Sequence, residues 1–257
     1  MTQTENYISK AIAWAREAGD LQLEYFRRHG LQIQTKQNAS DVVTAADKAS
    51  ERLLTDHILE CCPGHSILSE ESGSMGDTDS EWKWVIDPLD GTTNFSQGLP
   101  VFCVSIALQR YGETVGAIVN APYLGEIFHA IKGKGAWLNG APIHCAEAKP
   151  LEECVMATGV PYDKADNPDN NLENILNIAP RVRGIRRLGS AALDLCYLGA
   201  GFIDAYWELN LNPWDVEAGL LIVTEAGGKQ HRLADRRGVS VAAGSPEGLN
   251  HLLALLK

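Results

Sequence analysis

Residues 83–95 read KWVIDPLDGTTNF, a stretch that combines the residue types of metal-assisted phosphate chemistry. Asp87 and Asp90 follow an apolar run and flank a Pro-Leu pair, so their carboxylates repel each other unless a cation lies between them. Hard cations such as Mg²⁺ take oxygen ligands, and the free carbonyl of Leu89 offers a third one. We therefore predict a cation site here; the structural alternative is a capped turn with two solvated aspartates.

The residues after the second aspartate indicate an anion site beside the cation site. Gly91, Thr92 and Thr93 are typical of a loop that opens a short helix, whose exposed backbone N–H groups point at an anion. A cation site and an anion site made by adjacent residues favour a metal-assisted reaction of a phosphate.

Acidic residues at three other places in the chain are candidates for the same site. Glu70 and Glu71 end the strand-like segment HSILSE, where the alternative is a solvated loop pair. Asp47 in T-A-A-D would otherwise complete a capping box at the start of a helix. Asp215 would otherwise only begin a helix after Pro213. Taken singly, each acid leaves both interpretations open.

Together these segments resemble the inositol monophosphatase family of Mg²⁺-dependent phosphatases. The resemblance rests on SEES at 69–72, WVIDPLDGTTNF at 84–95 and GSAALDLCYLGAGFIDAYWELNLNPWDVEAG at 189–219. Order and spacing match along essentially the whole chain, from TAAD at 44–47 to TEAGG at 224–228. The resemblance implies the layered αβαβα sandwich of the inositol monophosphatase and fructose bisphosphatase (sugar phosphatase) superfamily. It also implies a homodimer and inhibition by lithium.

The resemblance assigns metal ligands residue by residue. It implies that Glu70, Asp87 and the carbonyl of Leu89 bind one Mg²⁺ ion. Asp90 and Asp215 would share a second ion with Asp87, which bridges the two. Two such ions, ~4 Å apart, would activate the attacking water and hold the leaving oxygen. A third, weaker Mg²⁺ near Glu70 occurs in relatives.

The resemblance also implies roles around the phosphate. Glu70 and Thr92 would orient and deprotonate the water, with Asp47 hydrogen-bonded to the Thr92 hydroxyl. The backbone N–H groups of Gly91 and Thr92 would hold the phosphate.

For the alcohol half of the substrate, the resemblance points to Asp90, the backbone of Ala191, and Glu208. A strand-end surface charge is the alternative for Glu208. Lys36 matches a family lysine near the metal site, with a solvated strand-edge lysine as the alternative.

The motif T-T-N-F narrows the substrate only partly. Relatives that act on phosphoadenosine phosphates carry D-G-T-K-E-F, so that substrate is disfavoured. Inositol monophosphate or a similar polyol phosphate is our first expectation, and fructose bisphosphate, histidinol phosphate and NADP are alternatives. Arg186 and Arg187 could face substrate, a partner subunit or water.

A different class of function is a mainly non-catalytic, protein-binding role, because some bacterial relatives associate with the transcription machinery. The complete acidic set at Glu70, Asp87, Asp90 and Asp215 favours catalysis over that role. A Ca²⁺-binding module is disfavoured, since the sequence has no D-x-D-x-D-G loop.

Two helices and several short strands are expected to position these residues. Helical spacing predicts a first helix capped by Gly30, and TAADKASERLLTDHILE from Thr44 predicts a second, ended by Pro63 and Gly64. LQIQTK, HSILSEES and KWVID predict strands, and Pro88 would stiffen the exit from the last of them.

The remaining chain divides into two patterns. From Val101 to about Ile143, strand-like runs separated by Gly, Pro and Asn predict an antiparallel meander. After about Leu151, short strands alternate with helices. We therefore expect an N-terminal α+β half, residues 1–150, with most metal ligands, and a C-terminal α/β half, residues 151–257, that completes the site.

Composition limits the class of protein. The chain has 257 residues, 33 acidic and 22 basic side chains and a formal net charge of -11, which argues against direct nucleic-acid binding. No apolar run approaches the ~20 residues that span a bilayer. The N-terminus offers no secretory pattern, and the six cysteines form no C-x-x-C pair. We expect reduced thiols in a cytoplasmic protein.

Overall fold

Two large β-sheets and the helices packed on them make up the molecule. The computed structural model describes residues 2–28, 34–35, 42–234 and 237–257. The helices are α1 (Gln3–Tyr25), α2 (Ala45–Cys61), α3 (Thr92–Ser96), α4 (Leu172–Ile178), α5 (Ala191–Gly199), α6 (Pro213–Glu225) and α7 (Pro246–Leu253), with 3₁₀ turns η1 (Leu151–Glu153) and η2 (Ala179–Arg181).

The first large sheet has eight strands in the order β10-β9-β8-β7-β6-β5-β3-β4. They are β3 (Ser66–Ser69), β4 (Gly73–Gly76), β5 (Trp82–Asp90), β6 (Cys103–Arg110), β7 (Glu113–Ala121), β8 (Glu126–Ile131), β9 (Gly135–Leu138) and β10 (Ala141–Pro142). Strands β3 and β5 pair in parallel and the other neighbours are antiparallel. Strands β6 to β9 confirm the predicted meander.

The second large sheet has five strands in the order β12-β11-β13-β15-β14. They are β11 (Val155–Thr158), β12 (Gly184–Arg186), β13 (Ala205–Leu211), β14 (Lys229–Arg232) and β15 (Val239–Gly244). Strand β11 runs parallel to both neighbours, whereas β15 is antiparallel to β13 and β14. A separate ribbon pairs β1 (Gln34–Thr35) with β2 (Val42–Val43).

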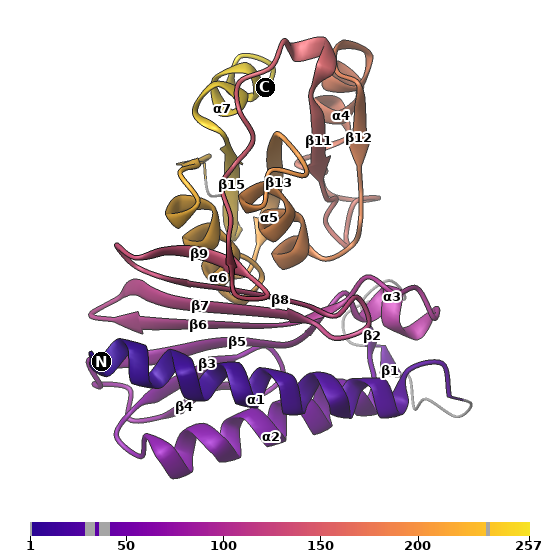
Figure 1. Ribbon diagram of the computed structural model, residues 1–257. Helices are drawn as coiled ribbons and strands as arrows, with labels where there is room; N and C mark the ends of the chain where they lie inside the picture. Colours follow the sequence, from indigo (N-terminus) through magenta and orange to yellow (C-terminus); the bar gives the residue numbers. More distant parts are fainter. Residues whose placement is uncertain (1, 29–33, 36–41, 235–236) are drawn as a thin grey trace.

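The elements stack in five layers, which confirms the predicted αβαβα sandwich. Figure 1 shows α1 and α2 below the first sheet, α5 and α6 between the two sheets, and α4 and α7 on the far side of the second. Four apolar clusters fill the four contacts between layers. Among their members are Trp84 below the first sheet, Phe128 above it, Tyr206 below the second and Trp207 above that. The division of the chain near residue 150 stays a prediction.

The first two helices each begin at a capping box, and the start of the second at Thr44 is the one that the sequence predicts. Thr2 and Glu5 form a capping box at α1, and Thr44 and Asp47 form one at α2. Helix α1 buries Ile8 and Trp14 against the first sheet but ends at Tyr25. The predicted cap Gly30 lies outside the described residues.

Strand β5 is longer than the sequence predicts. Pro88 was expected to stiffen the exit from the strand, but β5 continues through it to Asp90. The pairing with β6 shifts register between Asp87, opposite Ser105, and Asp90, opposite Cys103. This bulge lets a proline sit inside the strand, because the ladder need not receive its missing N–H.

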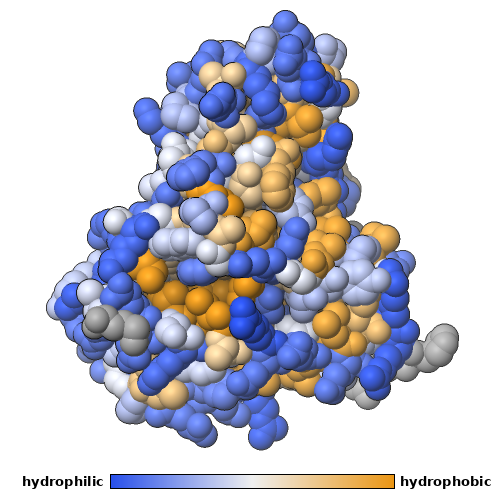
Figure 2. All heavy atoms as spheres, in the orientation of Figure 1, coloured by the Kyte–Doolittle hydropathy of each residue, from blue (hydrophilic) through white to orange (hydrophobic). Residues whose placement is uncertain are grey.

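The surface and the cysteines fit an ordinary globular fold. In Figure 2, hydrophilic residues cover most of the face, and hydrophobic ones gather above helix α1, over the strands of the first sheet. In the part of the chain that the structure describes, no helix is long and apolar enough to cross a bilayer. All six cysteines fall in described ranges and are free thiols.

The middle helix layer predicts a packing-sensitive glycine. A Cβ at Gly219 of α6 would lie 2.6 Å from Cβ of Leu195 in α5, so the helices would have to separate. We expect Gly219→Ala to lower the free energy of unfolding by about 1–3 kcal/mol, despite alanine's better helix propensity. Denaturant titration of Gly219→Ala and of Gly64→Ala measures this, since a Cβ at Gly64 meets nothing within 4 Å. Equal stability of the two variants would contradict the packing argument.

Candidate active site

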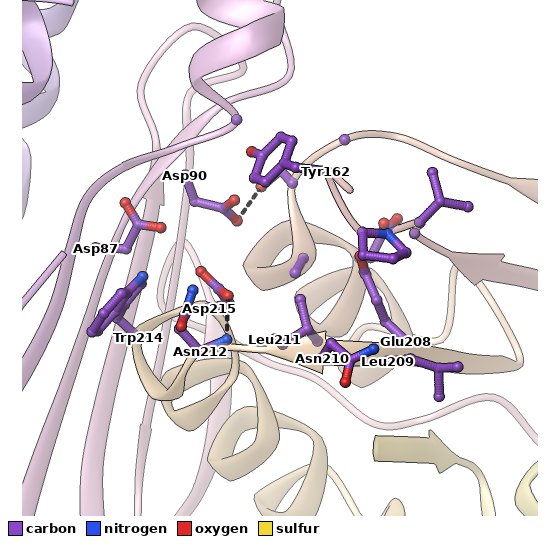
Figure 3. Close-up of a pocket in the computed structure, with 18 of the residues that line it drawn as sticks. Asp87, Asp90, Tyr162, Glu208, Leu209, Asn210, Leu211, Asn212, Trp214 and Asp215 are labelled. Carbon is purple, nitrogen blue, oxygen red and sulfur yellow. Dashed lines mark hydrogen bonds between the residues drawn. The ribbon is translucent and has the colours of Figure 1, made fainter. Parts of the chain in front are cut away.

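A cavity of about 520 Å³ lies where the end of β5 meets the starts of α3, α5 and α6 and the strand β13. It collects most of the site residues that the sequence predicts: Glu70, Asp87, Leu89, Asp90, Gly91, Thr92, Ala191, Glu208 and Asp215. Asp47 lies behind Thr92 and contacts it, while Lys36 falls outside the described residues. Figure 3 shows Asp87, Asp90 and Asp215 on one side of the cavity and Glu208 on the other.

The two aspartates of the D-P-L-D motif are both held by backbone amides. Asp87 is 2% exposed, and its Oδ1 accepts a hydrogen bond from the Leu89 N–H at 3.0 Å. Asp90 Oδ2 accepts one from Ser190 Oγ at 2.7 Å and one from the Ala192 N–H at 2.8 Å. One oxygen of each carboxyl is thus anchored, which fixes the direction of the other.

Asp215 combines its two predicted roles. Its Oδ2 accepts a hydrogen bond from the Asn212 N–H at 2.6 Å, completing a capping box at the start of α6 (Figure 3). The same carboxyl borders the cavity that Asp87 and Asp90 border. Beginning a helix and joining the acidic cluster are therefore not alternatives for this residue.

Burial and mutual repulsion dominate the electrostatics of the site. Burial, followed by the charges of Glu70, Asp90 and Asp215, holds the pKa of Asp87 well above its usual range. Burial raises the pKa of Asp90 to about 6, against the opposing hydrogen bond from Ser190. Burial and the charge of Asp90 also raise the pKa of Asp215 well above its usual range. An added cation would relieve this repulsion.

The donor set fits a hard cation in chemistry, although the carboxyls are not yet arranged around one point. Carboxylate and carbonyl oxygens are the donors that Mg²⁺ prefers, and Glu70, Asp87, Asp90, Asp215 and the Leu89 backbone border one cavity. Among the described residues, however, no three His, Cys, Asp or Glu side chains are placed so that they could hold an ion together. Binding one would require these side chains to turn toward it.

Thr92 and Asp47 form the hydrogen bond that the sequence predicts. Thr92 Oγ1 lies 2.9 Å from Asp47 Oδ1, and both residues are buried. Asp47 Oδ2 meanwhile accepts hydrogen bonds from the Thr44 N–H at 2.8 Å and from its hydroxyl at 2.6 Å. The capping box that was the structural alternative for Asp47 therefore coexists with the contact to the site.

The carbonyl of Leu89, a predicted metal ligand, has one hydrogen-bonding neighbour in the protein. The Thr92 hydroxyl lies 3.0 Å from it and 2.9 Å from Asp47 Oδ1. One hydroxyl proton cannot serve both acceptors fully. When Thr92 donates to Asp47, the Leu89 oxygen is available to another partner.

The predicted anion site begins at a glycine in a left-handed backbone conformation. Gly91 has φ 95°, a left-handed conformation, and precedes helix α3, which begins at Thr92. A Cβ at Gly91 would lie 2.8 Å from the Val101 carbonyl oxygen, so no other residue fits there without a shift. Gly91 and Thr92 both line the cavity, and the first amides of a helix have no partner within it.

The alcohol end of the predicted site is walled by α5 and β13. Glu208 Oε2 accepts a hydrogen bond from the Tyr206 hydroxyl at 2.7 Å, and burial raises the pKa of Glu208 to about 7. Its carboxyl occupies the space where a Cβ of Gly159 would lie, 1.8 Å from Oε1. The backbone amide of Ala191 faces the Asp90 carboxyl and helps to offset its raised pKa.

Of the two arginines before the G-S-A-A motif, only one lines the cavity. Arg187 lines the cavity and is exposed, whereas Arg186 donates a hydrogen bond from Nη1 to the carbonyl of the adjacent Ile185.

Asn94 of the T-T-N-F motif donates hydrogen bonds to the carbonyls of Val101 and Leu188, at 2.8 and 2.7 Å. The motif's asparagine therefore joins the loop before β6 to the loop before α5.

Several lining residues escaped the sequence analysis, among them Tyr162, Ser190 and Asp194. Ser190 caps α5 through the Leu193 N–H, so a cap search within the quoted G-S-A-A segment would have found it. Tyr162 and Asp194 carry no comparable local signal, because their positions depend on contacts distant in the chain.

The chain is similar to proteins of one family over nearly its full length. A model of the inositol monophosphatase family matches residues 3–254. The inositol-1-monophosphatase of Synechocystis sp. is 45% identical over 198 residues, 77% of this chain and 69% of that protein. The Nus factor SuhB of Escherichia coli K12 is 40% identical over 221 residues, 86% of this chain and 83% of that protein.

A solved structure extends the similarity to three dimensions. The inositol monophosphatase of Anabaena (Nostoc) sp. PCC 7120 has a TM-score of 0.88 to this chain at 37% identity. The match covers 100% of this chain and 98% of that structure. Both sheets and all the layers of helices are therefore part of the shared fold.

The raised pKa values of Asp90, about 6, and Glu208, about 7, predict a pH-dependent stability in the presence of a chelator. Both groups bind protons more tightly in the folded state, so their stabilising contribution is complete below their ordinary pKa values and is lost as pH rises through about 6–7. We expect the double variant Asp90→Asn, Glu208→Gln to have a higher thermal midpoint than the unsubstituted protein at pH 8. The difference should shrink as pH falls and vanish below the ordinary pKa values of 3.8 and 4.5; a difference that is independent of pH would contradict the burial argument.

Proposed function

Because the chain belongs to the inositol monophosphatase family, and is therefore a phosphoric monoester hydrolase, we propose that it hydrolyses inositol monophosphate or a similar small polyol phosphate, with Mg²⁺ as cofactor. The products would be the alcohol and inorganic phosphate. The observation that carries the proposal is the gathering of four acidic side chains, Glu70, Asp87, Asp90 and Asp215, around one cavity beside the amides of α3.

The proposed metal ligands are the acidic groups of that cavity. Glu70, Asp87 and the Leu89 carbonyl would hold one ion, and Asp87, Asp90 and Asp215 a second, with a third, weaker ion near Glu70. Mg²⁺ bound there would supply an activated water and neutralise charge on the phosphoryl group and leaving oxygen. The high pKa values of Asp87 and Asp215 support this assignment, since a cation favours the ionised forms that the bare cavity disfavours.

We propose that Thr92 and Glu70 orient the attacking water and move its proton. The Thr92 hydroxyl donates to Asp47 Oδ1 at 2.9 Å, which leaves the Thr92 oxygen free to accept a hydrogen bond from water. Asp47 acts through Thr92, because its other oxygen is occupied by Thr44. This arrangement supports proton transfer to the acidic cluster without a covalent enzyme intermediate.

The substrate would lie across the cavity, with its phosphate toward α3. The amides of Gly91 and Thr92 would bind the phosphate oxygens. Asp90, the backbone of Ala191, and Glu208 would bind the hydroxyl groups of the alcohol. Fructose bisphosphate, histidinol phosphate and NADP remain the alternative substrates, since T-T-N-F does not separate them.

A protein-binding role is the second candidate function. It is favoured by the relative from Escherichia coli K12 that is named Nus factor SuhB and is 40% identical to this chain. The acidic balance of the chain, a formal net charge of -11, disfavours direct contact with nucleic acid, so a protein partner is the form this role would take. A cytoplasmic location and a homodimer complete the proposal.

Replacing a proposed ligand of the second ion tests the metal assignment. We expect Asp90→Asn to lower kcat by at least about 100-fold, because even residues that only orient metal ligands contribute about 10- to 100-fold. Circular dichroism and the thermal midpoint should show an intact fold. Near-normal turnover by a folded Asp90→Asn protein would refute the role of Asp90.

Replacing Glu208 separates alcohol recognition from chemistry. Glu208→Ala should raise KM for inositol 1-phosphate several-fold more than KM for p-nitrophenyl phosphate, which offers no hydroxyl groups to bind. Steady-state kinetics on both esters, with matched Mg²⁺, measure the difference. An equal change on the two esters would remove Glu208 from the alcohol site.

The proposed function as a whole is tested by phosphate release from a panel of esters. The panel contains inositol 1-phosphate, fructose 1,6-bisphosphate, histidinol phosphate, NADP and phosphoadenosine phosphate, each with Mg²⁺ and with EDTA. We expect Mg²⁺-dependent turnover led by inositol 1-phosphate and none by Asp90→Asn. No turnover of any ester would favour the protein-binding role.

A further inference from the structure

Asp194 is a buried acid of the cavity to which the proposed mechanism gives no role. It lies one turn after Ala191 in α5, on the side of the helix that faces the cavity, and is 2% exposed. Within the described residues its Oδ1 is buried and has no hydrogen-bond partner. Burying such a group lowers the stability of the fold, so a carboxyl at this position requires a functional explanation.

The groups facing Asp194 come from three elements. Glu208 of β13 and Asp90 of β5 repel its charge, and Arg187 attracts it. Burial and the Glu208 charge together hold the pKa of Asp194 well above its usual range. Asp194 and Glu208 therefore place two carboxyl groups on the wall of one cavity.

The two members of this pair differ in how their oxygens are committed. Glu208 Oε2 is occupied by the Tyr206 hydroxyl at 2.7 Å, and Asp194 makes no such bond in the described part of the chain. A carboxyl group accepts hydrogen bonds from hydroxyl groups and, when protonated, also donates one. Hydroxyl groups also donate and accept, so the pair matches two neighbouring hydroxyls better than an apolar or purely anionic group.

We propose that Asp194 is a specificity-determining residue that, together with Glu208, binds adjacent hydroxyl groups of the substrate's alcohol. This inference rests on the proposed function, because it assigns the alcohol end of the same cavity. It adds a third carboxyl to the two, Asp90 and Glu208, that the family resemblance supplies for the alcohol.

A pair of variants and two esters test the assignment. Asp194→Leu keeps a side chain of similar length but cannot hydrogen-bond, whereas Asp194→Asn still donates and accepts. Inositol 1-phosphate and cyclohexyl phosphate share a six-membered ring, and only the first carries hydroxyls. The control is Asp79→Leu, a change of the same kind on an exposed turn.

We expect Asp194→Leu to lower kcat/KM for inositol 1-phosphate roughly ten- to a hundredfold, the range of hydrogen bonds to charged groups, and to leave cyclohexyl phosphate little changed. Asp194→Asn should retain most of the preference for inositol 1-phosphate. The thermal midpoint of Asp194→Leu should equal or exceed that of the unsubstituted protein, because an unpartnered buried carboxyl is removed.

Binding of the alcohol alone provides a readout that needs no turnover. myo-Inositol at millimolar concentration should raise the thermal midpoint of the unsubstituted protein and of Asp79→Leu, but not that of Asp194→Leu. A cyclohexanediol without adjacent hydroxyl groups should not raise the thermal midpoint of any of the three proteins. Equal shifts in all proteins, no shift in any, or equal kinetic losses on both esters would overturn the role of Asp194. Failure to hydrolyse either ester, with the inositol-dependent shift intact, would instead overturn the proposed phosphatase substrate and leave Asp194 as a polyol-binding residue.

Discussion

The repulsion between buried carboxyl groups is the constraint on which the site depends. Asp87, Asp90 and Asp215 border one cavity, where the charges of Asp90 and Asp215 raise the pKa of Asp87 and the charge of Asp90 raises the pKa of Asp215. Without a bound cation, hydrogen bonds from backbone amides and one hydroxyl group oppose the repulsion. The Leu89 N–H donates to Asp87, and the Asn212 N–H donates to Asp215. The Ser190 hydroxyl and the Ala192 N–H donate to Asp90. The fold holds these acids together against their own charge, which is the state that a cation-binding site requires.

The arrangement of the middle layer serves the same end. Helices α5 and α6 both begin at the cavity, since Ala191 and Asp215 in their first turns line it. The N-terminus of a helix carries a partial positive charge, and two of them here face the acidic cluster. The layer that joins the two sheets is therefore also a source of positive potential for the site.

Much of the architecture follows from local sequence. The meander after Val101, the capped start of α2 at Thr44 and the helix after Pro213 all carry short-range patterns, and the structure confirms them. The course of β5 through Pro88 could not be predicted from local sequence, because a bulge depends on the register of the neighbouring strand β6. Local rules describe what a segment favours, and pairing with a distant strand can override them.

The site was predicted unevenly for the same reason. The acids of the quoted motifs were found, and their cavity collects them. Asp47 and Asp215 were treated as either caps or site residues, yet each carboxyl has two oxygens and a cap occupies only one. Asp194 and Tyr162 were missed, because what makes them notable is a cavity assembled from separate segments between Glu70 and Arg237.

The shared middle layer has a consequence for how the chain reaches its folded state. The first sheet ends at Pro142, but one of its faces packs through Val85 and Phe128 on α5 and α6, which are complete only at Glu225. During synthesis this apolar face therefore emerges long before the helices that cover it. A fragment that stops near residue 150 would keep that face open to water, and self-association would be its expected fate. The two halves differ in pattern along the sequence, yet they are obliged to fold as one unit.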